Sequence, residues 1–134
     1  MQVDISELGR KHPLDHFNNA TLKALTEVAV TTEYKKNDKI FSIGDEDPMV
    51  AFLISGAVTL ESIDGQIISI DHNHSMAQFG LANLRPRLYK AIAASDDTVL
   101  FWVSNEILDI AISRDWQSQE IAVAHNLSSQ TAPS

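Results

Sequence analysis

The chain has 134 residues, a formal net charge of −8 at pH 7 and 44% hydrophobic residues, a size and composition that suit one domain with a single core and exclude a disordered chain. It contains no cysteine, which excludes disulfides and thiolate zinc sites and agrees with the cytoplasmic location that we expect. The acidic charge argues against nucleic-acid binding, because such binding neutralises phosphates, and no apolar run approaches the roughly 18 residues of a membrane span.

The first thirty residues predict two helices. Residues 4–10 form a short one, which His12-Pro13 ends. A longer helix is expected over residues 20–29, with Asn18 or Asn19 as its cap. Its core-facing side is predicted by apolar residues at helical spacing, with Phe17 packed at its start: Leu22, Leu25 and Ala29.

From residue 30 the apolar pattern changes to a period of two, which predicts about eight short strands separated by turns. Asn37 tolerates the left-handed backbone of a turn, and Asp64-Gly65 is typical of a hairpin. The strands expected most clearly are 39–43, 49–54, 57–63, 66–71, 89–94 and 98–103. Many short strands at regular spacing predict a sandwich or barrel.

After the last strand, Ser104 is expected to cap a helix from Asn105 to about Ser113, with Ile110 off its apolar stripe as an interface candidate. A further helix is expected over 120–127. We therefore predict a mainly β fold, an antiparallel jelly-roll-like β-roll with flanking N-terminal and C-terminal helices. The domain would span residues 1–116, and residues 117–134 would form a C-terminal helix, tail or linker.

The order of several short motifs resembles the cyclic-nucleotide-binding domain family, which includes the sensor domain of the catabolite activator protein and the regulatory subunits of cyclic-AMP-dependent kinase. The resemblance runs from about Phe17 to Ile112. It is carried by the basic turn at 34–41 and by Gly44-Asp45, an aliphatic strand and Ser55-Gly56. Both glycines would lie where a β-roll turns sharply with a positive φ, which a side chain disfavours.

In that family, ligand binders carry Phe-Gly-Glu-Leu-Ala/Ser-Leu, a short helix, and Pro-Arg-Ser/Thr-Ala. The glutamate accepts from the ribose hydroxyl and the arginine pairs with the cyclic phosphate. The segment 79–91, here called the cassette, departs from this pattern. Phe79-Gly80 and Pro86-Arg87 match, but Leu81 replaces the glutamate, and too few residues remain for the helix. A second register places Leu88 at the arginine position, and we prefer Arg87 because Pro86 precedes it.

No acidic residue lies between Asp71 and Asp96, a stretch that carries three cations. Local positive charge in an acidic protein favours a small anion over a polyanion. The resemblance and this charge pattern together predict a ligand site, with cyclic AMP or cyclic GMP as candidate ligands and no cofactor. Its candidate residues are Phe79, Gly80, Leu81, Ala82, Arg85, Pro86, Arg87, Tyr89, Lys90 and Ala91.

These expectations define a regulatory module, not an enzyme, that binds cyclic AMP, cyclic GMP or another small anion weakly or with altered specificity. Its C-terminal helix would pass the signal to a second copy or to an effector domain. The alternative is a protein-interaction or dimerisation domain without a ligand. A cupin-like metal protein is a distant third, because His72-x-His74 is followed by Gln78 where a glutamate ligand would stand. We predict no metal site and no catalytic residues.

Overall fold

The computed structural model describes residues 4–113, so the expected helix 120–127 and the segment 117–134 lie outside the described residues. Helical elements come first along the chain: α1 (Ile5–Leu8), the 3-10 turn η1 (Leu14–His16) and α2 (Asn19–Val28). The strands and a second 3-10 turn follow: β1 (Val30–Tyr34), β2 (Lys39–Phe41), β3 (Met49–Ser55), β4 (Ala57–Ser62), β5 (Ile67–Asp71), η2 (Ser75–Gln78), β6 (Tyr89–Ala93) and β7 (Thr98–Ser104). Residues 105–113 are helical.

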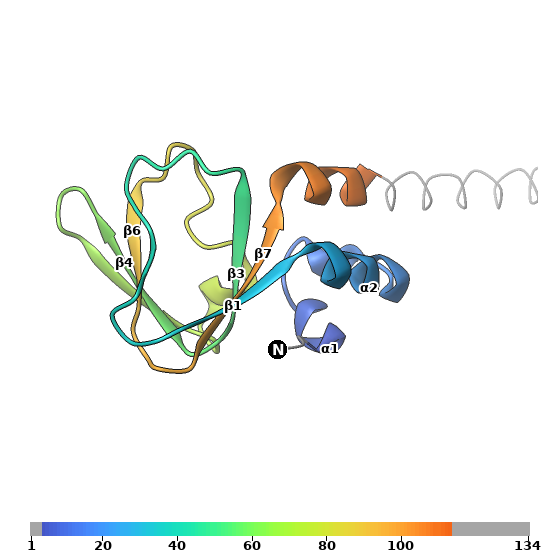
Figure 1. Cartoon of the computed structure of the whole chain (residues 1–134), viewed down its shortest axis with the longest axis horizontal. Coiled ribbons are helices and arrows are strands. Elements are labelled where there is room, and N and C mark those ends of the chain that lie inside the picture. The colour runs from blue at the N-terminus through green and yellow to red at the C-terminus, as the bar shows by residue number, and fades with distance from the viewer. Residues whose placement is uncertain (1–3, 114–134) are drawn as a thin grey trace, which may run out of the picture.

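The strands form two antiparallel sheets, with strand orders β1-β7-β3 and β2-β6-β4-β5. In Figure 1 the strands lie on one side of the molecule and α1, α2 and helix 105–113 on the other. This arrangement confirms the predicted β-roll with flanking helices, with seven strands in the described part of the chain. Among residues 4–113, no helix is long and apolar enough to cross a membrane.

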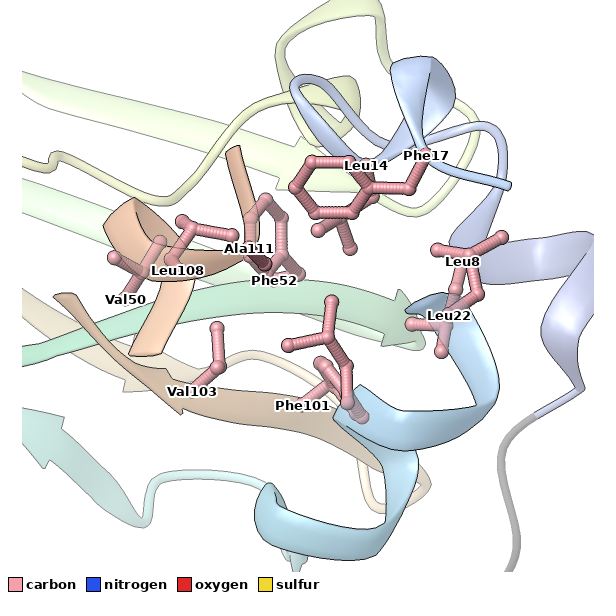
Figure 2. Packing of buried hydrophobic residues seen from close by; sticks show 11 residues of the cluster. Leu8, Leu14, Phe17, Leu22, Val50, Phe52, Phe101, Val103, Leu108 and Ala111 are labelled. Carbon is pink, nitrogen blue, oxygen red and sulfur yellow. The ribbon is translucent and has the colours of Figure 1, made fainter. Parts of the chain in front are cut away.

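Strands β3 and β7 separate two hydrophobic cores. One face of each strand packs against the helices, and Figure 2 shows Val50, Phe52, Phe101 and Val103 beside Leu8, Leu14, Leu22 and Leu108. The opposite face supplies Ala51, Leu53 and Leu100 to the interior of the roll. Because both faces of β3 are buried, its sequence is continuously apolar, which is why residues 49–54 lack alternation.

Local sequence signals explain several boundaries. The Asn18 side chain accepts from the Thr21 amide at 2.8 Å, which confirms the cap of α2. The hydroxyl of Ser104 accepts from the Ile107 amide at 3.1 Å and caps helix 105–113 as predicted. Asn37 has a φ of 77°, and Gly44, Gly56 and Gly65 all have positive φ, so the predicted turns are confirmed.

Candidate functional site: the cassette

Backbone hydrogen bonds tie the cassette to the loop and strand that precede it in sequence. The Leu81 amide donates to the Ala51 carbonyl at 2.8 Å, which holds the start of the cassette against β3. Near its end, the Arg87 amide donates to the Asp45 carbonyl at 2.9 Å, and the Gly44 amide donates to the Arg87 carbonyl at 2.7 Å. These two bonds therefore fix the backbone of Arg87 to the β2–β3 loop (residues 42–48).

Arg87 is only 1% exposed, and all of its side-chain nitrogens contact acceptors of the protein itself. Its Nε and Nη2 donate to the two carboxylate oxygens of Asp47, each at 2.9 Å. Nη2 also donates to the Met49 carbonyl at 2.9 Å, while Nη1 donates to the carbonyls of Leu81 and Ala82 at 3.1 and 3.4 Å. Since a guanidinium has five N–H donors, none remains for a ligand in this arrangement.

The guanidinium carbon of Arg87 also lies 3.9 Å from the centre of the Phe41 ring, a cation–π distance. The Asp47 side chain that accepts this charge-assisted pair is 30% exposed. The hydrogen bond from Arg87 is the main cause that lowers the pKa of Asp47, while partial burial opposes it. Asp47 is therefore the anion that Arg87 holds.

The two other cations of the stretch also contact acidic side chains. Arg85 Nη2 lies 3.4 Å from Asp47 Oδ1, and its Nε donates to the Asp47 carbonyl at 2.5 Å. Lys90 Nζ lies 4.0 Å from a carboxylate oxygen of Glu61 on the neighbouring strand β4. The stretch that has no acidic residue in the sequence is thus neutralised in part by acidic residues from elsewhere.

The large apolar side chains of the cassette divide into one that is buried and three that are exposed. Leu81, for which the resemblance predicts the position of the family's glutamate, is 2% exposed and belongs to the core inside the roll. Phe79, Leu84 and Leu88 are 50%, 62% and 52% exposed, respectively. The segment therefore encloses Arg87 and exposes three large apolar side chains.

The remaining candidate residues of the cassette lie in different environments. Tyr89 is half-buried against the core of the roll, and Ala91 is fully buried there. Gly80 packs so closely on β3 that a Cβ would lie 2.6 Å from Val50 Cγ1. Ala82 has a φ of 40°, and Pro86 is exposed. Of the residues in the two registers, Arg87 is buried and Leu88 is 52% exposed, and the choice between the registers stays a prediction.

Asp47 is the residue of this site that the sequence did not indicate. The run Asp45-Glu46-Asp47 is typical of a turn, and the Asp45 carboxylate does cap one by accepting from the Ser42 amide at 2.9 Å. Asp47, however, pairs with a residue 40 positions further along the chain. Only the knowledge that the β2–β3 loop and the cassette lie together would have identified it.

Among the described residues, one group has three metal-ligand side chains with donor atoms within 4.8 Å of one another: His12, Asp15 and His16, all exposed. His12 Nδ1 lies 3.2 Å from Asp15 Oδ1, which also suits an ion pair when the imidazole is protonated. His72 and His74 belong to no such group within residues 4–113. The spacing of His72 and His74 had made that pair a metal candidate, whereas no pattern in the sequence indicated His12, Asp15 and His16.

The fold is that of the regulatory and sensor domains built on the cyclic-nucleotide-binding β-roll. A cyclic nucleotide-binding-like protein from Brucella abortus superposes with a TM-score of 0.62 and 22% identity, over 82% of this chain and 97% of that one. The sensor domain of the transcriptional regulator DNR from Pseudomonas aeruginosa gives 0.63 and 18%, over 97% and 94%.

A third similar structure is the regulatory subunit of a cAMP-independent protein kinase A from Trypanosoma cruzi, bound to guanosine, with a TM-score of 0.68 and 11% identity. It matches 92% of this chain, which spans 44% of that one. No family model and no curated protein sequence matches the chain. The similarity is therefore one of fold, and it confirms the fold that the motif order predicted.

Proposed function

We propose that this chain is a regulatory domain that acts through contacts with other proteins and does not need a cyclic nucleotide. The observation that carries the proposal is the internal pairing of Arg87. Its five N–H donors contact Asp47 and three backbone carbonyls at 2.9 to 3.4 Å, so a cyclic phosphate has to displace Asp47 before it can bind.

The ribose side of the family's site is equally altered. Leu81 provides no acceptor, and its burial in the core of the roll leaves no place there for a carboxylate. A ribose hydroxyl left unpaired costs about 1–3 kcal/mol when buried, which corresponds to roughly ten- to hundredfold in affinity. Losses at both the phosphate and the ribose contacts act in the same direction, against cyclic-nucleotide binding.

The outward face of the same segment supports a protein contact. Leu84, Leu88 and Phe79 are each at least half exposed, which gives large apolar side chains to a surface loop. Exposed apolar groups of this kind are typical of interaction surfaces when they gather together. We propose that these residues contact a protein partner, and that a second copy of the chain is the first partner to test.

Calorimetry on the full chain tests the ligand half of the proposal. We expect no heat from cyclic AMP, cyclic GMP or guanosine up to millimolar concentration. Saturable micromolar binding that Arg87→Ala abolishes would contradict the proposal. The matched control is Lys36→Gln, a cation of the β1–β2 turn remote from the cassette, which should leave the titrations unchanged.

Light scattering tests the contact half. We expect a nucleotide-independent oligomer that Leu88→Glu or Leu84→Glu dissociates. Ile63→Glu serves as the control, because Ile63 is 87% exposed at the tip of the β4–β5 hairpin, outside the cassette. A monomer at all concentrations, or equal dissociation by the hairpin variant, would contradict self-association through the cassette.

A second candidate function, a weak anion sensor, is supported by the charge balance of the site. Arg85 and Arg87 share the single carboxylate of Asp47, which leaves one positive charge uncompensated among these three groups. An anion that replaces Asp47 would open the cassette and move the strand β6 that follows it. If this is the function, Asp47→Asn will strengthen cyclic-nucleotide binding into the micromolar range, whereas the contact proposal predicts no binding by either protein.

A further inference from the structure

A second polar site, which shares no residue with the cassette, lies between the N-terminal segment and the turn after β5. The site is a cavity of about 470 Å³, within the usual size range of small-molecule sites. One wall comes from Glu7, Arg10 and Lys11, and the other from His72, Asn73 and His74. Residues more than 60 positions apart in the chain thus place several hydrogen-bond donors around one space.

Lys11 is the reason to regard this cavity as a binding site. The residue is only 5% exposed, and its ammonium donates to the Ala77 carbonyl at 2.7 Å. An ammonium has three N–H donors, so two of them lack an acceptor among the residues that the structure describes. Burial lowers the pKa of Lys11, and the carboxylate of Glu7 only partly opposes this effect. A buried cation with so few partners favours an anion beside it.

One of the two histidines, His74, adds a directed donor. His74 Nδ1 accepts from the Met76 amide at 3.0 Å, so in the neutral ring the proton resides on Nε2, which can donate. His72 Nδ1 lies 3.4 Å from the Gly56 carbonyl, and in the neutral ring that donates to this carbonyl Nε2 is an acceptor, so His72 lines the cavity without adding a donor to it. The amide of Asn73 supplies further donors at the same wall.

Arg10 and Glu7 form the exposed rim. Arg10 Nη1 lies 3.6 Å from Glu7 Oε1, and the Arg10 side chain is 74% exposed, so the guanidinium is available to a ligand. Lys11 and Arg10 against Glu7 give the cavity one net positive charge with neutral histidines. Glu7 opposes an anion by repulsion, and its effect on binding therefore has the opposite sign to that of Arg10.

We propose that this cavity binds a phosphate group, and that Lys11 is its principal contact. The site is separate from the cassette and does not depend on the proposed function. Inorganic phosphate needs only part of the 470 Å³, so a small organic phosphate fits the space better. The two sources share the same oxyanion chemistry, and they are separated by titrating inorganic phosphate and glycerol 3-phosphate in parallel.

Calorimetry on the full chain tests the proposal through variants with opposite expected signs. Arg10→Gln should weaken binding of either phosphate severalfold, and Lys11→Met by at least about tenfold, the value of a hydrogen bond to a charged group. Glu7→Gln should tighten binding severalfold, a gain that a purely structural role of this residue does not produce. Lys90→Gln, a cation of the cassette, is the control and should change affinity less than about twofold.

Backbone NMR shifts during the titration locate the site, and we expect them at Asn73 and Gln78. Arg10 and Glu7 are exposed, so their variants should fold even if Lys11→Met does not. Absence of heat with both phosphates, an unchanged or weakened affinity in Glu7→Gln, or shifts confined to residues 79–91 would each overturn the proposal.

Discussion

The carboxylate of Asp47 and the guanidinium of Arg87 meet in a two-pronged contact, with both N–H···O distances at 2.9 Å. Asp47 lies two residues before the start of β3 in one sheet, and Arg87 lies two residues before the start of β6 in the other. The pair therefore joins the two sheets of the roll at the start of one strand from each. The contact that encloses Arg87 is at the same time a link between the two sheets.

Replacing Asp47 with Asn tests this link. The change leaves a buried guanidinium without its counter-charge, so we expect the free energy of unfolding to fall by about 2–4 kcal/mol. Urea denaturation followed by tryptophan fluorescence measures it. Asp97→Asn, at the β6–β7 turn, is a matched control for which we expect a change within about 0.5 kcal/mol. A loss no larger than that of the control would mean that Asp47 does not support the fold.

The same carboxylate predicts a dependence on pH. Arg87 holds the pKa of Asp47 below that of a free aspartate, so between the two values the folded chain binds fewer protons than the unfolded chain. Stability from this group is present above the unfolded pKa of about 3.9 and is lost as pH falls through the folded pKa. The urea midpoint should drop between about pH 5 and pH 3, and the drop should be smaller in Asp47→Asn. If the urea midpoints of the two proteins fall equally as the pH is lowered, Asp47 is not the cause of the pH dependence.

Leu81 gives a third prediction, because the resemblance places it where ligand binders of the family carry glutamate. Its side chain is 2% exposed inside the roll, so Leu81→Ala should cost about 2–4 kcal/mol through the cavity that it leaves. Leu81→Glu should cost more, since a carboxyl buried there has no partner, and it should not create cyclic-nucleotide binding. Thermal unfolding and calorimetry check both variants. A stable Leu81→Glu protein that binds cyclic AMP would show that the site differs from the family's by one residue only.

Gly56 and Gly65 form a matched pair for a fourth prediction. Both have positive φ, but a Cβ at Gly56 would lie 2.6 Å from Thr98 Cα, whereas nothing lies within 4 Å at Gly65. Gly65→Ala should therefore lower the free energy of unfolding only by the cost of a positive φ for alanine, about 1 kcal/mol. Gly56→Ala adds a clash with the backbone of β7, and we expect a loss of about 3 kcal/mol or more. Similar losses at both positions would mean that β7 moves aside at little cost.

Local patterns in the sequence predict most of this fold. The caps at Asn18 and Ser104 and the turns at Asn37 and Gly65 depend only on neighbours in the chain, and all four are found. The site is different, because its chemistry depends on pairs that are distant in sequence. Arg87 was singled out from its own segment, but its partner Asp47 comes from a loop that looks like an ordinary turn.

The polar cavity beside Lys11 illustrates the same limit. No periodicity or spacing in the sequence relates Lys11 to the turn at residues 72–74. The His72-x-His74 pair in that turn suggested only the metal-binding alternative, which ranks third among the functions predicted from the sequence. Tertiary packing places them together. The ligand-binding roles assigned to cassette residues remain predictions, and the enclosed position of Arg87 is what their tests must address.

The burial of Arg87 has a consequence for the conditions under which the domain keeps its shape. Dissolved ions weaken attraction between charges that face water, but they do not reach a guanidinium enclosed by protein. Concentrated salt should therefore loosen the Lys90–Glu61 pair at the surface and leave the junction between the sheets intact. The contact between Asp47 and Arg87 should therefore persist at salt concentrations at which surface ion pairs no longer contribute.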